Sequence, residues 1–205
     1  MSNVIKTNLK IKPSISDARN ALHEVYRNAR VVRSGKHFTT VNELCDQVPA
    51  LRPEILRAAV SEALEFGTFG ANKILSEEDK GAAIATAFSL SVELPLCMAR
   101  WYPYDIPGQI KVEIKSEYFS GSLYMNGIER GDKVLIIEDT LSTGGTMIAM
   151  IEAVIKAGAE VVGAIAVIEK VANEGHDNVW LKTGIDVKTC IKIDVTEAGV
   201  EILEE

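Results

Sequence analysis

The sequence has little cysteine, and what it has is scattered. Three cysteines occur in 205 residues, at positions 45, 97 and 190, and no two of them form a CxxC pair. An odd number at such distances argues against a disulfide framework and against a thiolate zinc site. The cysteine content therefore indicates a reducing compartment.

Long apolar runs are also missing. The first residues, MSNVIKTNLKIKP, contain no apolar core of a secretory signal. The most apolar stretch, residues 81–99, is interrupted by Glu93 and Pro95, so it predicts a helix followed by a strand rather than a membrane span. We expect a soluble, cytoplasmic protein with no membrane partner.

Positive charge is scarce over most of the chain. The net charge is −7, which argues against a dedicated nucleic-acid binder. The imbalance is uneven, because residues 1–70 carry 10 Lys and Arg against 7 Asp and Glu, whereas residues 71–205 carry 12 against 22. The length allows one domain with an appendage, and the change of pattern predicts an N-terminal segment, 1–70, and a core, 71–205.

Short apolar runs alternate with helical patterns after residue 70. The pattern predicts strands over 73–75, 94–100, 133–139, 161–170 and 187–195, and helices over 82–93 and 146–158. Before residue 70 it predicts helices over 14–32 and 54–67, with a loop between them. This alternation indicates an α/β fold with a mostly parallel central sheet covered by helices on both faces.

The segment VLIIEDTLSTGGT, residues 134–146, carries the chemistry. A buried strand ends in Glu138 and Asp139, and a turn rich in hydroxyl groups and glycine leads directly into a helix. Ligands of open α/β sheets bind beyond the carboxyl ends of strands, and backbone amides at a helix N-terminus bind phosphate. Ionised carboxylates suit sugar hydroxyls or Mg²⁺ with its waters. The plainer alternative is a solvated strand–helix turn.

Two common nucleotide motifs are absent from this turn. It has no lysine in a G-x-x-x-x-G-K-[ST] arrangement and no G-x-G-x-x-G. The segment instead resembles the phosphoribosyl pyrophosphate motif of the type I phosphoribosyltransferases. KILSEEDKGAAIA resembles the family's pyrophosphate loop, LPLCMARW its next strand, and residues 102–127 its long catalytic loop. The tail from Ile168 resembles xanthine and archaeal-type hypoxanthine enzymes.

The resemblance implies transfer of ribose 5-phosphate from phosphoribosyl pyrophosphate to a purine base, with Mg²⁺ as cofactor and pyrophosphate as product. Glu138 and Asp139 would hold the ribose hydroxyls or the metal, directly or through water. Lys80, Gly81 and Arg100 would face the pyrophosphate. The loop holding the 5-phosphate would comprise Thr140, Leu141, Ser142, Thr143, Gly144, Gly145 and Thr146.

The catalytic loop supplies further candidates by resemblance. Lys115, with residues 116–118, would touch the substrate when the loop closes, and closure would exclude water from the reacting carbon. The alternation KVEIK fits a plain β-ribbon equally well. Lys80 can alternatively pair with Glu77 or Glu78, and Arg100 can stack on Trp101.

Lys170 ends the predicted strand 161–170 and is the candidate for base binding. An ammonium group only donates hydrogen bonds, so it suits O6 of hypoxanthine, guanine or xanthine better than the amino group of adenine. A solvated lysine at a strand end is the alternative. Some related enzymes carry an aspartate in the phosphate loop that takes a proton from the base, but here that position is Ser142.

Two other functions remain open from the sequence. An adenine-specific phosphoribosyltransferase shares the core motifs. A DNA-binding regulator with the same fold would use the basic stretch from Lys6 to Lys36, which has 8 Lys and Arg and 2 acids. The resemblance favours an N-terminal hood over the base, and it implies a homodimer.

Overall fold

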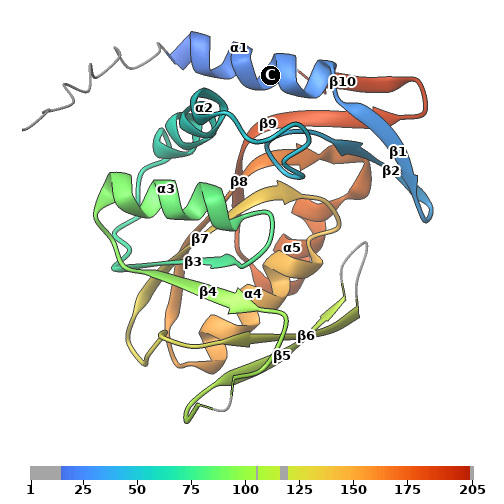
Figure 1. Cartoon of the computed structure of the whole chain (residues 1–205). Helices are drawn as coiled ribbons and strands as arrows, with labels where there is room; N and C mark the ends of the chain where they lie inside the picture. Colours follow the sequence, from blue (N-terminus) through green and yellow to red (C-terminus); the bar gives the residue numbers. More distant parts are fainter. Residues whose placement is uncertain (1–14, 105, 116–119, 204–205) are drawn as a thin grey trace, which may run out of the picture.

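The computed structural model describes residues 15–104, 106–115 and 120–203, and it is built around one large sheet (Figure 1). Within these ranges the sheet has eight strands in the order β10-β9-β8-β7-β3-β4-β6-β5. Their bounds are β3 Lys73–Glu77, β4 Leu96–Arg100, β5 Ile110–Lys115, β6 Ser120–Met125, β7 Lys133–Leu141, β8 Glu160–Lys170, β9 Val187–Thr196 and β10 Gly199–Leu203.

The five inner strands, from β9 across to β4, run parallel to one another, and β10, β6 and β5 pair antiparallel with β9, β4 and β6, respectively. From β3 the chain crosses to β4 on one side, whereas from β7 it crosses to β8 on the other. The connections therefore diverge between β3 and β7. In open α/β sheets such a divergence marks the ligand site.

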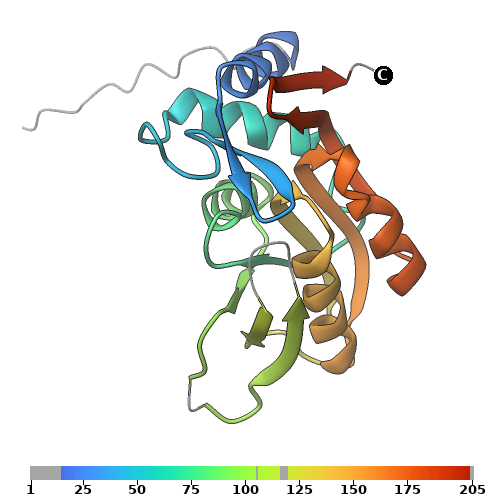
Figure 2. The same ribbon diagram turned by 90° about the vertical axis from the view of Figure 1, so that its right-hand side faces the viewer.

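Helices cover both faces of the sheet. Alternate residues of β7 separate into two apolar clusters, with Leu135 and Ile137 in one and Val134 and Ile136 in the other. The first cluster includes α1 (Ile15–Arg27), α2 (Pro53–Leu64) and α3 (Ala82–Val92), and the second includes α4 (Gly145–Lys156) and α5 (Gly175–Thr183). Figure 2 shows the two layers from the side. The α/β prediction is confirmed.

The prediction for residues 14–40 is wrong in part. The first helix ends at Arg27, and a two-stranded hairpin follows, with β1 over Arg30–Ser34 and β2 over His37–Val41. Gly35 has φ +58° and forms, with Lys36, the two-residue turn between β-branched runs, which is a common hairpin pattern. The hairpin lies beside β9 and β10, at the upper right of Figure 1.

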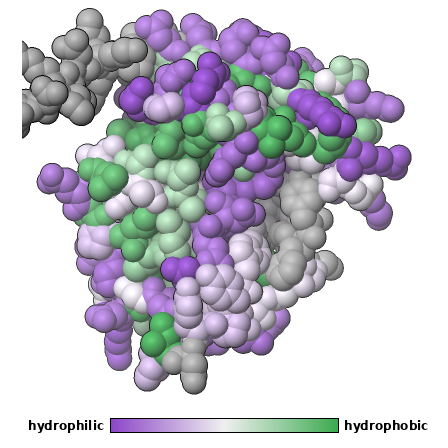
Figure 3. Space-filling model, viewed as in Figure 1, coloured by the Kyte–Doolittle hydropathy of each residue, from purple (hydrophilic) through white to green (hydrophobic). Residues whose placement is uncertain are grey.

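The hydropathy of the surface differs between α1 and α3. Hydrophilic residues lie over α1, whereas hydrophobic residues gather over α3 (Figure 3), where Leu90 is exposed. Among the described residues, no helix has the length and apolar character needed to cross a membrane.

Candidate functional site

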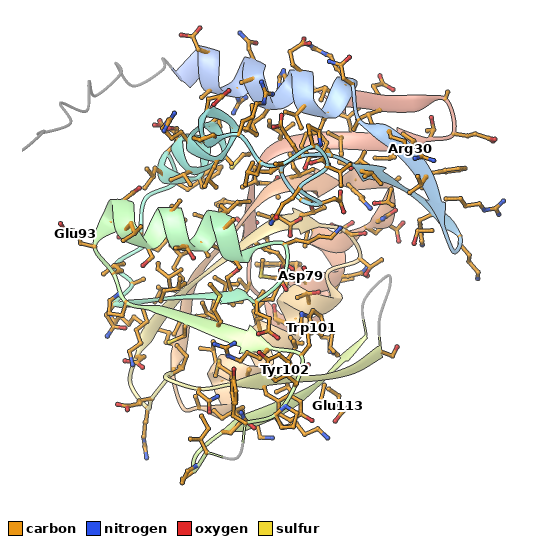
Figure 4. All side chains as sticks on the ribbon, viewed as in Figure 1. Arg30, Asp79, Glu93, Trp101, Tyr102 and Glu113 are labelled. Atoms are coloured by element: carbon orange, nitrogen blue, oxygen red, sulfur yellow. The ribbon has the colours of Figure 1, made fainter. Side chains whose placement is uncertain are left out.

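A cavity of about 450 Å³ opens at the carboxyl ends of β3 and β7, where the connections diverge. The structure brings most of the predicted site residues to it from distant parts of the chain. They are Lys80, Glu138, Asp139, Thr140, Leu141, Ser142, Thr143, Gly144, Gly145, Thr146 and Lys170. Gly81 and Arg100 lie outside its lining, whereas Asp79 and Trp101, both labelled in Figure 4, belong to it.

The turn after β7 presents the N-terminus of α4 to the cavity. Gly144 is the residue before the helix and has φ +82°, a conformation that glycine adopts readily. No side chain caps this end of α4, and its first turn has no acidic residue. The first amides of the helix therefore have no partner within α4, and with the helix dipole they favour an anion.

A second layer of residues holds this turn in place. The Asn173 side chain donates a hydrogen bond to Ser142 Oγ at 2.7 Å, and Asn178 donates to the Thr143 carbonyl at 3.3 Å. Gly175 packs so tightly that a Cβ there would lie 2.0 Å from the Ser142 carbonyl oxygen. The segment 173–178, which includes the start of α5, thus fixes the shape of the turn.

Three carboxylates line the cavity and are almost fully buried: Glu77, Glu138 and Asp139. Burial raises the pKa of Glu138 well above its usual value, and the charges of Asp139 and Glu77 raise it further. Asp139 accepts a hydrogen bond from the Thr140 hydroxyl at 2.9 Å. This concentration of negative charge suits a ligand that brings cations or hydroxyl donors.

Replacing Glu138 with glutamine should stabilise the free protein at pH 8. Because its folded pKa is raised, ionisation of Glu138 costs stability as the pH rises from about 4.3, the unfolded value, through the folded pKa. Each 1 kcal/mol relieved should raise Tm by about 2–4 °C in a protein of this size. Thermal melts at pH 8 and pH 4.5 check this, since the gain should vanish at the lower pH. Equal Tm values at pH 8 would contradict it. Glu201→Gln, which changes an exposed residue of β10, is the matched control.

Glu77 organises the loop between β3 and α3. Its carboxylate accepts hydrogen bonds from the backbone amides of Asp79 and Gly81, each at 2.6 Å, and from Trp101 Nε1 at 3.3 Å. Burial raises the pKa of Glu77, although these backbone bonds oppose the rise. The buried carboxylate therefore shapes the loop that carries Lys80.

Lys80 and Arg100, the two cations predicted to bind pyrophosphate, each form an ion pair with a carboxylate. Neither has the partner that the plainer alternative from the sequence named. Lys80 pairs with Asp46 at 2.6 Å, rather than with Glu77 or Glu78. Burial lowers the pKa of Lys80, but Asp46 and Asp139 more than offset this, so the net pKa is raised. Arg100 donates to Glu78 at 2.9 Å and lies over the Tyr104 ring, 5.0 Å from its centroid, rather than on Trp101.

The N-terminal segment supplies site residues that were not predicted from the sequence. Thr39, Thr40 and Cys45 line the cavity. Lys170 Nζ donates to Thr39 Oγ1 at 3.0 Å, so its ammonium group is oriented within the cavity. The adjacent threonines Thr39 and Thr40 were the available signal, but the segment that carries them was expected to be a loop.

The side chain of Lys115 and residues 116–118, which were predicted to touch the substrate, lie outside the described residues. The backbone around them forms a ribbon, since β5 and β6 pair antiparallel from Ile110 to Met125. In the described part of the chain, no three His, Cys, Asp or Glu side chains are close enough to hold a metal ion on their own.

Known proteins resemble this chain along most of its length. The model of the phosphoribosyl transferase domain matches residues 69–205. A hypoxanthine/guanine phosphoribosyltransferase of Methanocaldococcus vulcanius is 41% identical over 183 residues, which cover 89% of this chain and 99% of that protein. One from Ferroglobus placidus is 38% identical over 185 residues, covering 90% and 97%.

Solved structures share the fold. An adenine phosphoribosyltransferase from Rhodothermus marinus superposes with a TM-score of 0.69 at 26% identity, covering 86% of this chain and 99% of that one. The Trypanosoma brucei enzyme, with AMP, pyrophosphate and ribose 5-phosphate, gives 0.71 at 18% identity, covering 88% and 81%. The match over 69–205 and the identity across nearly the whole length of its relatives lead to one conclusion: this chain belongs to the phosphoribosyl transferase family.

Proposed function

We propose that the protein transfers ribose 5-phosphate from phosphoribosyl pyrophosphate to a 6-oxopurine, hypoxanthine or guanine, in purine salvage. The observation that carries the proposal is the joint position of the uncapped α4 N-terminus and the carboxylates of Glu138 and Asp139 at one cavity. The turn Thr140–Thr146 takes the 5-phosphate through its amides and hydroxyls. Glu138 and Asp139 then face the ribose hydroxyls.

The reaction replaces one bond at the ribose C1. The bond from C1 to the pyrophosphate oxygen breaks, a purine nitrogen bonds to C1, and that nitrogen loses its proton. Positive charge develops on the ribose as the first bond breaks, so buried carboxylates near the sugar favour the transition state. The rest of the work is positioning, since both substrates are held in one cavity.

The pyrophosphate side of the site is the loop after β3. Lys80 lines the cavity there and supplies positive charge, with its ammonium held by Asp46. Arg100 stands behind this loop, tied to Glu78, so it reaches the pyrophosphate only if that ion pair opens. We therefore assign the direct contact with pyrophosphate to Lys80. Gly81 and Arg100 lie next to that contact and do not make it in this conformation.

Mg²⁺ fits the chemistry of this donor set. Glu77, Glu138 and Asp139 give the cavity three buried carboxylates, and hard cations prefer such oxygens. When bound with the substrate, Mg²⁺ would supply positive charge that offsets the negative charge of the pyrophosphate group. Because the described side chains form no closed metal site, Glu138 and Asp139 would hold the metal through water or together with substrate oxygens.

Lys170 would select the base. Its ammonium, oriented by Thr39, donates to a purine O6 and repels a ring edge that presents an amino group. This agrees with the names of the archaeal relatives, which are hypoxanthine/guanine enzymes. Ser142 stands where some related enzymes carry an aspartate that takes a proton from the purine. Another group must therefore accept the proton that the purine nitrogen loses.

The Lys170→Met variant should lose activity with hypoxanthine and guanine. A hydrogen bond from a charged group contributes about 1.5–3 kcal/mol, so kcat/KM should fall roughly 10- to 150-fold. Rates with adenine, hypoxanthine, guanine, xanthine and orotate, each with phosphoribosyl pyrophosphate and Mg²⁺, check both the base preference and this loss. Wild-type preference for adenine, or an unaffected variant, would contradict the assignment. Lys182→Met on exposed α5 is the control.

The N-terminal segment up to residue 70 would act as the hood over the base, with Thr39, Thr40 and Cys45 as its lining. Ala18, Leu22 and Tyr26 of α1 are buried in the same apolar cluster as the sheet, which favours a hood over a separate DNA-binding module.

We also propose a homodimer in solution, which light scattering would test.

A further inference from the structure

A second cavity lies outside the site described above, and the two share no lining residue. It measures about 830 Å³ and lies between α1, β9 and the start of α5. These elements follow one edge of the molecule in Figure 2. Its volume is within the range of small-molecule sites, which is about 300–1,000 Å³.

Two rows of basic side chains line this cavity. Arg19, His23 and Arg27 are spaced by four residues on α1, so they lie on one face of the helix. Lys188 and Lys192 are also four apart on β9, which places them on one face of the strand. Such a concentration of basic groups is unexpected in a chain with a net charge of −7. It favours an anionic ligand.

Arg19 is held in a fixed orientation. Its Nε donates at 3.0 Å to Glu62, whose side chain is only 2% exposed, and its Nη2 donates at 3.4 Å to the Cys190 carbonyl. A guanidinium group has five N–H donors, so these two bonds leave donors for a ligand. Arg27 makes a long, exposed ion pair with Glu24 at 3.5 Å, which is readily exchanged for a better acceptor.

Two carboxylates complete the lining. Asp186 pairs with both His176, at 2.9 Å, and Lys188, at 2.5 Å, while Glu169 accepts a hydrogen bond from the Thr189 hydroxyl at 2.8 Å. Basic groups that bind phosphate, next to carboxylates that accept from hydroxyl or amino groups, match a ligand with both features. We infer that this cavity is a second binding site, separate from the transfer site, for a nucleotide.

The second site touches the strand that carries the base-binding candidate. Glu169 lines the second cavity and Lys170 lines the first, because consecutive residues of β8 face opposite sides of the sheet. Glu169 also pairs in register with Lys192 of β9. A nucleotide bound here therefore lies against the strand end that holds Lys170, with β8 between the two ligands.

Calorimetric titration of the full chain with GMP tests this site. We expect one class of GMP binding to weaken at least about tenfold in the double variant Arg27→Gln, Lys188→Gln, because two charged contacts are lost. Basal transfer without added nucleotide should stay unchanged, since neither residue lines the transfer cavity. The control is Arg57→Gln, an exposed charge on α2 outside both cavities, which should bind GMP as wild type does.

This test of the second cavity can be interpreted whether or not the protein catalyses the proposed transfer. If GMP also binds the transfer site, two classes appear in the wild type and one persists in the double variant. If GMP binds only at the second cavity, its single class of binding weakens at least about tenfold while any transfer activity remains. GMP binding that is the same in wild type and double variant, or no GMP binding at all, would overturn the proposal. Guanosine, which lacks the phosphate, should not distinguish the two proteins.

Discussion

Replacing Asp139 with asparagine should reduce kcat at least about 100-fold while the protein stays folded. Losing one preorganised electrostatic group in an active site commonly costs 10²–10³ in kcat. Asp139 is 5% exposed and lines the transfer cavity, and in the proposed mechanism its carboxylate faces the ribose as charge develops there. Its replacement also removes a charge that raises the pKa of Glu138, so repulsion between buried carboxylates falls. Tm should therefore be unchanged or higher.

Turnover with hypoxanthine and a thermal melt, both at pH 8, check this expectation together. Glu201→Gln removes one exposed carboxylate from the edge strand β10 and should change neither quantity. Undiminished turnover in Asp139→Asn would show that the Asp139 carboxylate takes no part in catalysis. A large loss of Tm would show instead that the residue serves the fold.

The Gly144→Ala variant should lose most of its use of phosphoribosyl pyrophosphate. Gly144 has φ +82°, and a Cβ there would lie 2.8 Å from Val179 Cγ2 and 2.9 Å from the Gly175 carbonyl oxygen. The left-handed conformation costs roughly 1–2 kcal/mol for a residue with a Cβ, and the contacts force the turn to move. A displacement of about 1 Å in such a site can cost 100-fold, so we expect a fall of that order in kcat/KM.

The variant Gly184→Ala separates the effect of backbone strain at a positive φ from the effect of steric contact with the new Cβ. Gly184 also has a positive φ, +71°, but a Cβ there would meet no atom within 4 Å. It should therefore lose some stability and no transfer activity. Steady-state kinetics with varied phosphoribosyl pyrophosphate distinguish the pair, and equal kcat/KM in Gly144→Ala and wild type would show that the turn does not hold the phosphate.

The sequence predicts the core of this molecule well because its signals are local. The apolar run from Val134, the acids that end it and the glycine-rich turn belong to one continuous segment, so strand, turn and helix follow from neighbouring residues. The turn begins later than predicted, because β7 continues to Leu141. The boundary near residue 70 remains a prediction.

What the sequence could not predict depends on contacts between distant residues. Asp46 meets Lys80 across 34 positions, and Thr39 meets Lys170 across 131. No local pattern reports such pairs, since they follow from how the N-terminal segment packs over the sheet. The strand β10 was missed because Gly199–Leu203 is short and lies at the edge, where burial leaves a weak pattern.

The most direct test follows the products of one reaction. With phosphoribosyl pyrophosphate, hypoxanthine and Mg²⁺, the protein should release one pyrophosphate for each nucleotide formed, and omission of the base should abolish both. Chromatography of the nucleotide with an enzymatic assay for pyrophosphate measures this ratio. Pyrophosphate release without nucleotide, or no product with any of the five bases, would contradict transfer to a purine in this cavity.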